Sequence, residues 1–221
     1  MKILYLKNEP RVCGELLGNR IVELLDEDKS VLWLVPGGSN IPISVEAMKI
    51  IRGKTSVQGL SHLTISLTDE RYGEVGHADS NWQQLLNAGF SFDGVKAIPV
   101  LAGLSVEETV QKYGESVLFA MSTVDVVVGQ FGIGADGHIA GVLPHTLGVT
   151  STESTIFYTS EPYVRISLSL KTIEKIDSAY AFAFGSSKSK TLARLQNEEL
   201  SLDDQPSQVL KKIVESFLCI D

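Results

Sequence analysis

The 221-residue sequence predicts an α/β fold, with a Rossmann-like, mainly parallel sheet and helices on both faces. Apolar runs typical of strands alternate along the chain with segments in which apolar residues recur at helical spacing. This alternation is typical of βαβ units, which build a parallel sheet between two layers of helices. The sequence has no internal repeat, low-complexity tract or long linker, so we interpret residues 1–221 as a single domain.

The first half of the chain divides into short apolar runs and longer amphipathic segments. Strands are expected at 2–6, 31–35, 63–67 and 95–100. Helices are expected at 10–26, at 42–52, from about Ser80, and after the capping-box pattern Ser105-x-x-Glu108. The continuous apolar run 31–35 is typical of a strand covered on both faces.

The second half continues the same pattern with one polar interruption. Strands are expected at 124–129, 164–168 and 179–184, while residues 145–163 are interpreted as loop and short strand. One helix is expected through Leu192 and Leu195. A final helix is expected from Pro206 onward, on the spacing of Val209, Leu210, Ile213, Val214 and Phe217.

The composition bounds the partners and the cellular compartment. The formal net charge of −8 argues against nucleic acid or an anionic membrane as a partner. There is no run of about 18 apolar residues and no signal-peptide pattern, so we expect a cytoplasmic protein. Two cysteines, Cys13 and Cys219, lie in segments with helix-like patterns and lack metal-site spacing; we expect reduced structural thiols.

The most informative segment is 131–144, FGIGADGHIAGVLP, which follows the predicted strand 124–129. It places an acid, Asp136, two residues before His138, between glycines that permit close approach to a small ligand. Histidine is the side chain best suited to move a proton near neutral pH. Taken alone, the segment is also compatible with a tight turn carrying a hydrogen-bonded loop histidine.

Further polar clusters follow other predicted strands, and the carboxyl ends of parallel strands share one edge of a sheet. Residues 36–40, PGGSN, precede a helix, where exposed N–H groups favour an anion; an ordinary N-cap turn is the alternative. Residues 69–71, Asp-Glu-Arg, offer carboxylates and a guanidinium that can hold an oxyanion, or they form a solvated charge run. Arg165 lies at the start of a predicted strand and Lys188 at the start of a predicted helix. Both cations are suited to a phosphate or are simply exposed. No metal-ligand spacing occurs, so neither a metal nor another cofactor is expected.

Together these residues resemble the 6-phosphogluconolactonases, in the superfamily that also contains glucosamine-6-phosphate isomerase/deaminase. The resemblance covers nearly the whole chain and rests on motifs in the same order. These are Gly37-Gly38-Ser39, Asp69-Glu70-Arg71 followed by Ser80-Asn81, Gly132-Ile-Gly-Ala-Asp136-Gly-His138, Arg165-Ile-Ser-Leu and Gly185-Ser-Ser-Lys188.

The resemblance implies hydrolysis of 6-phospho-D-glucono-1,5-lactone to 6-phosphogluconate in the pentose phosphate pathway. His138 is the expected general base. Asp136 or Asp69 would orient its ring; we favour Asp69 for direct contact with the substrate or the histidine and Asp136 for shaping the loop. Arg71 is expected to stabilise the oxyanion or grip the substrate. The phosphate-binding residues would be Gly37, Gly38, Ser39, Arg165 and Lys188.

Two alternatives stay open: a sugar-phosphate isomerase or deaminase of the same superfamily, and a non-catalytic sugar-phosphate sensor. Deaminases typically have tyrosine at the position of Arg71 and glutamate at that of Leu143, which favours the lactonase. The chain also departs from the lactonase pattern at Pro36 and Asn40. Gly141 replaces the usual serine and is expected to widen or loosen the pocket. The expected assembly is a monomer or a small homo-oligomer.

Overall fold

The structure is a computed structural model that describes residues 1–221. Its centre is a seven-stranded sheet in which every neighbouring pair of strands is parallel. The strands, in spatial order, are β1 (Lys2–Tyr5), β10 (Glu215–Ile220), β9 (Ser178–Phe182), β6 (Val126–Phe131), β2 (Val31–Val35), β3 (Leu63–Leu67) and β5 (Lys96–Ala97). The predicted mainly parallel α/β fold is therefore confirmed.

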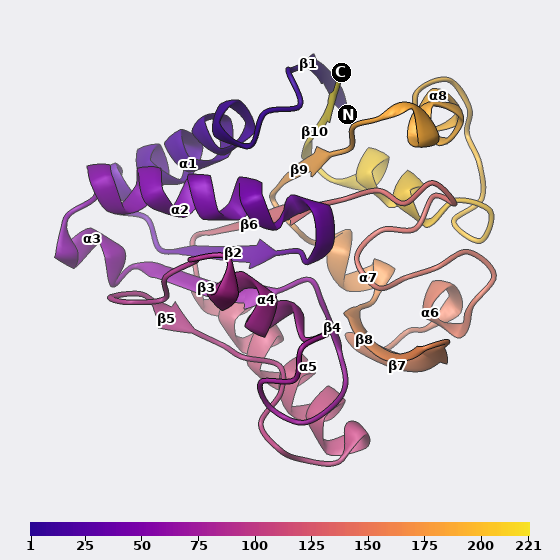
Figure 1. The fold of residues 1–221 in the computed structure, drawn as a ribbon, viewed down its shortest axis with the longest axis horizontal. Coiled ribbons are helices and arrows are strands. Elements are labelled where there is room, and N and C mark those ends of the chain that lie inside the picture. Colours follow the sequence, from indigo (N-terminus) through magenta and orange to yellow (C-terminus); the bar gives the residue numbers. More distant parts are fainter.

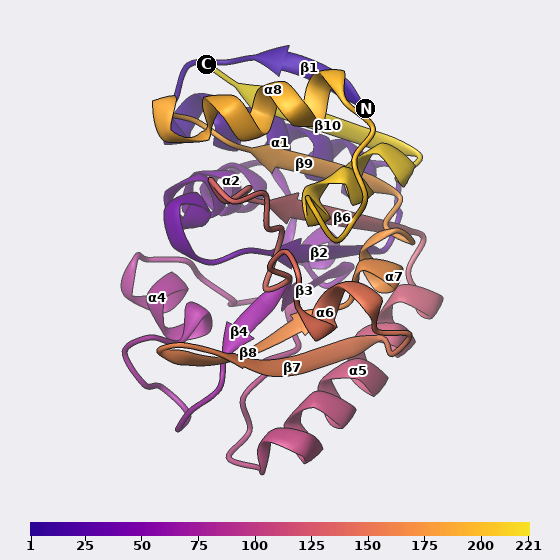
Figure 2. The same ribbon diagram turned by 90° about the vertical axis from the view of Figure 1, so that its right-hand side faces the viewer.

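Helices cover both faces of this sheet (Figure 1). The helices are α1 (Pro10–Asp26), α2 (Ile41–Lys54), α3 (Val57–Leu60), α4 (Asn81–Asn87), α5 (Val106–Thr123), α6 (Leu147–Thr150), α7 (Leu170–Ile173) and α8 (Ser189–Asn197), with 3₁₀ turns η1 (Gly38–Asn40), η2 (Ser186–Lys188) and η3 (Pro206–Lys212). Helices α1 and α2 pack together on one face, and α5 and α7 lie on the other (Figure 2). No helix is long and apolar enough to cross a membrane.

A second, smaller sheet stands beside the carboxyl ends of β2 and β3. It contains β4 (Asp69–Arg71), β8 (Tyr163–Leu168) and β7 (Thr155–Ser160), and its pairings are antiparallel. β4 begins two residues after β3 ends, so the chain passes directly from the large sheet into the small one. This arrangement brings β8, which carries Arg165, to the same region as the carboxyl ends of the parallel strands (Figure 2).

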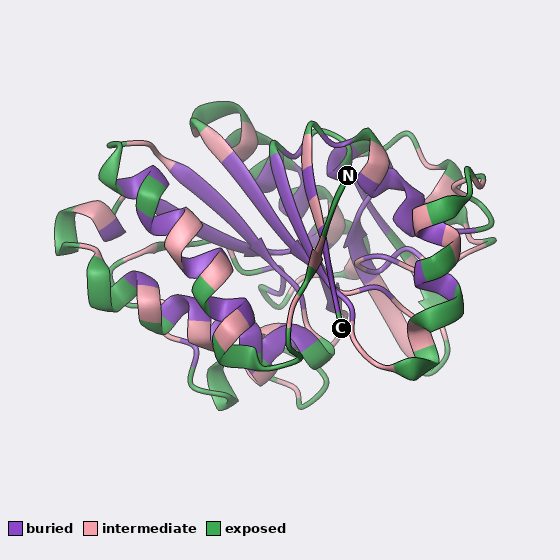
Figure 3. Cartoon of the chain, turned by 90° about the horizontal axis from the view of Figure 1, so that it is seen from above, coloured by how far each residue is buried: buried purple, intermediate pink, exposed green.

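The core follows from the apolar runs in the sequence. All five residues of β2, β3 and β9 are buried, because helices cover both faces of the sheet. Figure 3 shows the buried strands running through the middle, with exposed residues on the outer faces of the helices. Helix α5 begins with the predicted capping box, in which Ser105 accepts from the N–H of Glu108 and the Glu108 carboxylate accepts from the N–H of Ser105.

The C-terminal segment differs from the sequence prediction. Pro206 starts the 3₁₀ turn η3, and the expected continuous helix is wrong, because residues 215–220 form strand β10 between β1 and β9. Cys219 is consequently a buried strand residue, whereas Cys13 lies in α1 as expected. Of the apolar residues whose spacing predicted a helix, Val209, Leu210 and Ile213 are buried in η3 or directly after it, and Phe217 lies in β10. Val214 is 97% exposed.

Two other predicted elements have different limits. The polar region 145–163 contains both α6 and the six-residue strand β7, which is more regular structure than loop and short strand. The predicted strand 124–129 is shifted and ends at Phe131, so the loop that carries His138 begins directly at Gly132. The expected strand 95–100 is reduced to the two residues of β5.

Candidate functional site

A cavity of about 290 Å³ opens where the carboxyl ends of β2, β3, β6 and β9 meet the small sheet. Its wall contains most of the candidate residues from the sequence: Gly37, Gly38, Ser39, Asp69, Arg71, His138, Arg165 and Lys188. Asp136 is not part of the wall and lies against His138. The order of the strands therefore brings together motifs that are far apart in the sequence.

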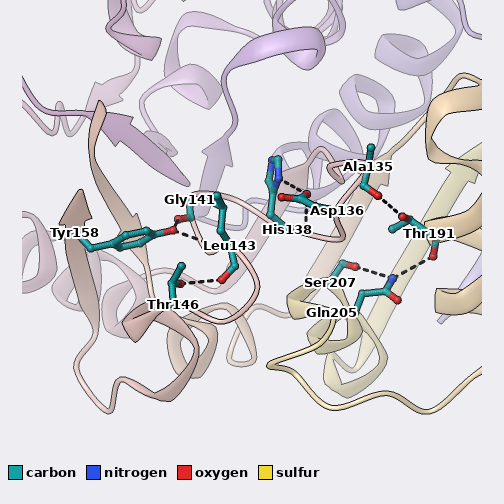
Figure 4. A network of polar contacts seen from close by, with 10 residues as sticks. All are labelled: Ala135, Asp136, His138, Gly141, Leu143, Thr146, Tyr158, Thr191, Gln205 and Ser207. Carbon is teal, nitrogen blue, oxygen red and sulfur yellow. Dashed lines mark hydrogen bonds and ion pairs between the residues drawn. The ribbon is translucent and has the colours of Figure 1, made fainter. Parts of the chain in front are cut away.

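His138 and Asp136 form a close acid–histidine pair (Figure 4). His138 Nδ1 lies 2.7 Å from Asp136 Oδ1, and the main-chain N–H of His138 donates to the same oxygen at 3.2 Å. The hydrogen bond from the His138 side chain lowers the pKa of Asp136 to about 2. An ionised carboxylate accepts the Nδ1 proton, which leaves Nε2 of the neutral ring as the basic nitrogen.

This geometry corrects the preference for Asp69 as the partner of the histidine. Asp69 accepts from the Thr68 hydroxyl at 2.9 Å and from the Asn81 amide at 3.4 Å, and no hydrogen bond joins it to His138. It remains available to the cavity, in whose wall it is the only carboxylate. The two aspartates therefore occupy different places: one beside the base and one facing the space where a ligand would lie.

A tight turn holds the acid–histidine pair together. The N–H of Gly134 donates to the His138 carbonyl, and the N–H of Gly137 donates to the Gly134 carbonyl, both at 3.0 Å. A Cβ at Gly134 would overlap with His138 Nδ1 and Asp136 Oδ1. Glycine is therefore required at this position for the carboxylate and the imidazole to meet.

Tyr158 of β7 supports the far end of the same loop (Figure 4). Its hydroxyl donates to the Gly141 carbonyl at 2.5 Å and accepts from the N–H of Leu143 at 3.1 Å. The small sheet thus fixes the segment that follows the histidine.

The C-terminal part of the chain supports the near end of the loop. The Thr191 hydroxyl donates to the Ala135 carbonyl, and the Gln205 amide donates to the Thr191 carbonyl at 3.1 Å and to Ser207 Oγ at 3.2 Å. The N–H of Ser207 donates to the Gly137 carbonyl at 3.0 Å. The loop is therefore held from α8 and η3 as well as from the small sheet (Figure 4).

Gly141 has a different effect from the one expected. Its N–H donates to Ser167 Oγ at 3.0 Å, and the residue is buried. An added Cβ would lie 2.8 Å from Ser167 Cβ and 3.2 Å from Asp69 Cβ. The glycine therefore lets the loop pack tightly on β8 and β4, and the expectation of a looser pocket is wrong.

Glu70 is a structural carboxylate inside the Asp-Glu-Arg motif. It is fully buried and accepts four hydrogen bonds: Oε1 from the N–H groups of Arg71 (2.7 Å) and Asn81 (2.6 Å), and Oε2 from Ser80 Oγ (2.9 Å) and the N–H of Trp82 (3.1 Å). Burial raises the pKa of Glu70, and these donors act in the opposite direction. Glu70 thereby ties the start of α4 to β4, which carries Asp69 and Arg71 into the cavity.

The glycine loop 36–40 is not an ordinary capping turn, since neither Ser39 nor Asn40 caps the following helix with its side chain. Gly38 has φ +63° and open space around its Cβ position, so its backbone faces the cavity unobstructed. Gly37 packs directly on the Asn81 side chain, where a Cβ would overlap the amide. The loop therefore presents main-chain groups and the Ser39 hydroxyl to the cavity.

Three cations in the cavity wall have no carboxylate partner. Arg71, Arg165 and Lys188 take part in none of the salt bridges of the protein. Partial burial without a compensating charge lowers the pKa of Lys188. An anionic ligand would supply the missing negative charge.

Some residues were assigned differently, or not at all, from the sequence. His77 and His145 lie outside the cavity wall: His77 Nε2 contacts the Arg71 carbonyl at 2.9 Å, and His145 pairs with Asp203 at 2.8 Å. Asn40 and Asn81 line the cavity, and each has a buried Oδ1 with no hydrogen-bond partner. The sequence named Asn81 as part of a motif and Asn40 as a departure from one, but it assigned neither residue to the wall of the site.

The model of the family described as glucosamine-6-phosphate isomerases/6-phosphogluconolactonase matches residues 10–218. The chain belongs to this family. None of the curated protein sequences compared with the chain matches it significantly.

Solved structures of members of this family share the fold along the whole chain. A 6-phosphogluconolactonase from Shewanella baltica has a TM-score of 0.78 at 21% identity, covering 99% of this chain and 97% of that one. The 6-phosphogluconolactonase from Thermotoga maritima has a TM-score of 0.76 at 17% identity, covering 99% and 98%. A monomeric glucosamine-6-phosphate deaminase has a TM-score of 0.82 at 17% identity, covering 100% and 97%. At these identities the likeness shows the fold, and the activity has to be argued from the site.

Proposed function

We propose that this protein hydrolyses 6-phospho-D-glucono-1,5-lactone to 6-phosphogluconate, a step of the pentose phosphate pathway, with water activated by His138. The observation that carries the proposal is the acid–histidine pair of Asp136 and His138 beside a cavity whose three cations have no carboxylate partner. A phosphorylated lactone needs both features: a base for water and positive charge for the phosphate.

The base is prepared by its carboxylate. Asp136 holds the Nδ1 proton, so Nε2 removes a proton from water as the oxygen attacks the lactone carbonyl. The tetrahedral oxyanion then collapses, the bond from C1 to the ring oxygen breaks, and the imidazolium returns the proton to the departing ring oxygen. Asp69, the carboxylate in the wall, is assigned to contact with the substrate hydroxyls.

The remaining residues of the wall are assigned to binding the negatively charged groups of the substrate. Gly37, Gly38 and Ser39 would offer main-chain and hydroxyl donors to the phosphate, together with Arg165 and Lys188. Arg71 is assigned to the oxyanion or to gripping the substrate. Binding at the phosphate, remote from the reacting carbonyl, positions the lactone over the water.

The absence of a second acid in the wall favours the lactonase over a deaminase. Asp69 is the only carboxylate that lines the cavity, and Leu143 directs its N–H to Tyr158. A deaminase requires acid/base groups for ring opening and for proton transfer between carbons, in addition to a base for water. Lactone hydrolysis needs only the base, a charged clamp and a water molecule.

The test is hydrolysis of freshly generated lactone, measured against the spontaneous reaction. We expect His138→Ala to lower kcat by about 10²–10⁴. His62→Ala is the matched control, because His62 also faces a carboxylate, Asp28 at 3.5 Å, but lies before β3 at the opposite edge of the sheet; its kcat should be unchanged.

Three results would count against the proposal. Full kcat in His138→Ala would remove the histidine from its role as the base. Binding of 6-phosphogluconate by the wild type without acceleration of hydrolysis would identify a sensor. Release of ammonia from glucosamine-6-phosphate would identify a deaminase.

A further inference from the structure

Arg71 and Arg165 face each other across the small sheet. They are paired in the antiparallel register of β4 and β8, and both line the cavity. The neighbouring pair is hydrogen-bonded, since the N–H of Tyr72 donates to the Val164 carbonyl at 2.8 Å. Arg71 and Arg165 therefore form a non-hydrogen-bonded pair, in which Cα atoms are about 4.5 Å apart and side chains approach most closely.

Two like charges directly opposite each other on a sheet are unfavourable. No carboxylate forms an ion pair with either guanidinium. The Nε atom of each arginine is buried and has no hydrogen-bond acceptor. The pair is thus a concentration of positive charge with unused donors, and some other group must hold its two members in place.

Tyr163 is that group. It lies two residues before Arg165 on β8, and the two-residue period of a strand puts their side chains on the same face. Its ring centroid lies 5.3 Å from Arg71 Cζ and 5.8 Å from Arg165 Cζ, within the range of cation–π attraction for both. One ring therefore contacts both cations.

Asp79 adds a second connection on the Arg71 side. Its carbonyl accepts from Arg71 Nη1 at 2.8 Å, and its carboxylate accepts from the Tyr163 hydroxyl at a longer 3.4 Å. The Asp79 contacts restrain Arg71 and, weakly, the edge of the ring. Arg165 has only the ring.

We propose that Tyr163 is a positioning residue, which holds Arg71 and Arg165 as a two-guanidinium clamp for a single phosphate group of the substrate. This inference rests on the proposed function, and it assigns Arg71 to gripping the phosphate together with Arg165. The ring offsets the repulsion between the cations, and their free N–H groups then meet the phosphate oxygens in a preset geometry.

The test compares Tyr163→Leu, Tyr163→Phe and a control, Phe157→Leu. Phe157 lies on β7 of the same small sheet, is 40% exposed and is absent from the cavity wall. KM and kcat would be measured with the lactone, and the Kd of 6-phosphogluconate and of inorganic phosphate by calorimetry.

We expect Tyr163→Leu to raise KM and both Kd values about tenfold, the loss of cation–π attraction to two partly desolvated cations, with kcat within about twofold of the wild type. Tyr163→Phe keeps the aromatic face and should recover most of the affinity. Phe157→Leu should match the wild type in KM, kcat and both Kd values.

Unchanged Kd values in Tyr163→Leu would overturn the proposal. So would a fall in kcat without a change in KM, or a Tyr163→Phe variant as weak as Tyr163→Leu. The proposed function fails separately, because a wild type that binds phosphate but does not hydrolyse the lactone would refute the activity and leave the clamp to be decided by the Kd values.

Discussion

Replacement of Glu70 by glutamine tests how the small sheet and α4 are joined beneath the cavity. The substitution keeps the shape of the side chain and changes one oxygen into an NH₂ group. Each carboxylate oxygen accepts two hydrogen bonds in the native protein. Whichever oxygen is replaced, the new NH₂ group faces donors, and at least one main-chain N–H loses its acceptor.

The magnitude follows from those contacts. An unsatisfied buried donor costs about 1–3 kcal/mol, and hydrogen bonds to a charged acceptor are worth more than those to a neutral amide. We therefore expect the free energy of unfolding to fall by about 2–4 kcal/mol. For a chain of this length, that corresponds to a Tm lower by about 4–16 °C.

The assay is urea denaturation and thermal unfolding of Glu70→Gln beside Glu108→Gln. Glu108 also caps the start of a helix with its carboxylate, but it is exposed and glutamine serves equally well in a capping box. The control should retain the wild-type stability. Equal stability of the two variants would refute the argument that Glu70 is an obligatory buried acceptor.

Two further predictions concern the chemistry of the cavity. Gly134→Ala should lower kcat by about 10² or more, because the added Cβ overlaps the contact between His138 and Asp136. The control Gly53→Ala, on α2 with open space around its Cβ, should leave kcat unchanged. Full activity in Gly134→Ala would contradict the placement of the acid–histidine pair. Burial lowers the pKa of Lys188, so its charge, and with it the affinity for 6-phosphogluconate, should be lost as pH rises through a value below that of an ordinary lysine. Calorimetry across the alkaline range should show this decline in the wild type and not in Lys188→Arg, and an identical pH dependence in both would exclude the lysine as its cause.

The sequence predicted the fold well where the signal was local and strong. The buried run of β2 and the capping box of α5 are contained in a few adjacent residues, and both are present in the structure. Convergence of the motifs also followed from the sequence, because the carboxyl ends of parallel strands share an edge.

The C-terminal strand could not be predicted in this way. Val209, Leu210, Ile213 and Phe217 have helical spacing, yet residues 215–220 pair with β9 and β1 in the sheet. The position that β10 fills between those two strands exists only in the complete fold, and pairing there overrides the helical preference indicated by the local periodicity.

The contacts between residues within the site also could not be predicted from the sequence. The contact of Asp136 with His138 depends on the turn at Gly137, with φ +92°, and without it we favoured Asp69 for direct contact with the substrate or the histidine. Glu70 looked like a surface charge, because its four donors come mainly from residues about ten positions later. Tyr163 belongs to none of the sequence motifs, and only the register of β8 against β4 shows what it contacts.

The position of β10 has a consequence for how the chain acquires its structure. β1 is an edge strand whose sole neighbour is β10, with Lys2 opposite Phe217. β1 therefore has no partner in the sheet until β10 has been synthesised, and a pairing of such high contact order slows folding. Until then β9 ends the sheet as an open edge, ready to pair with another chain. Before β10 pairs with it, the exposed edge of β9 is therefore the place where a chaperone would bind the nascent protein or where another chain would aggregate with it.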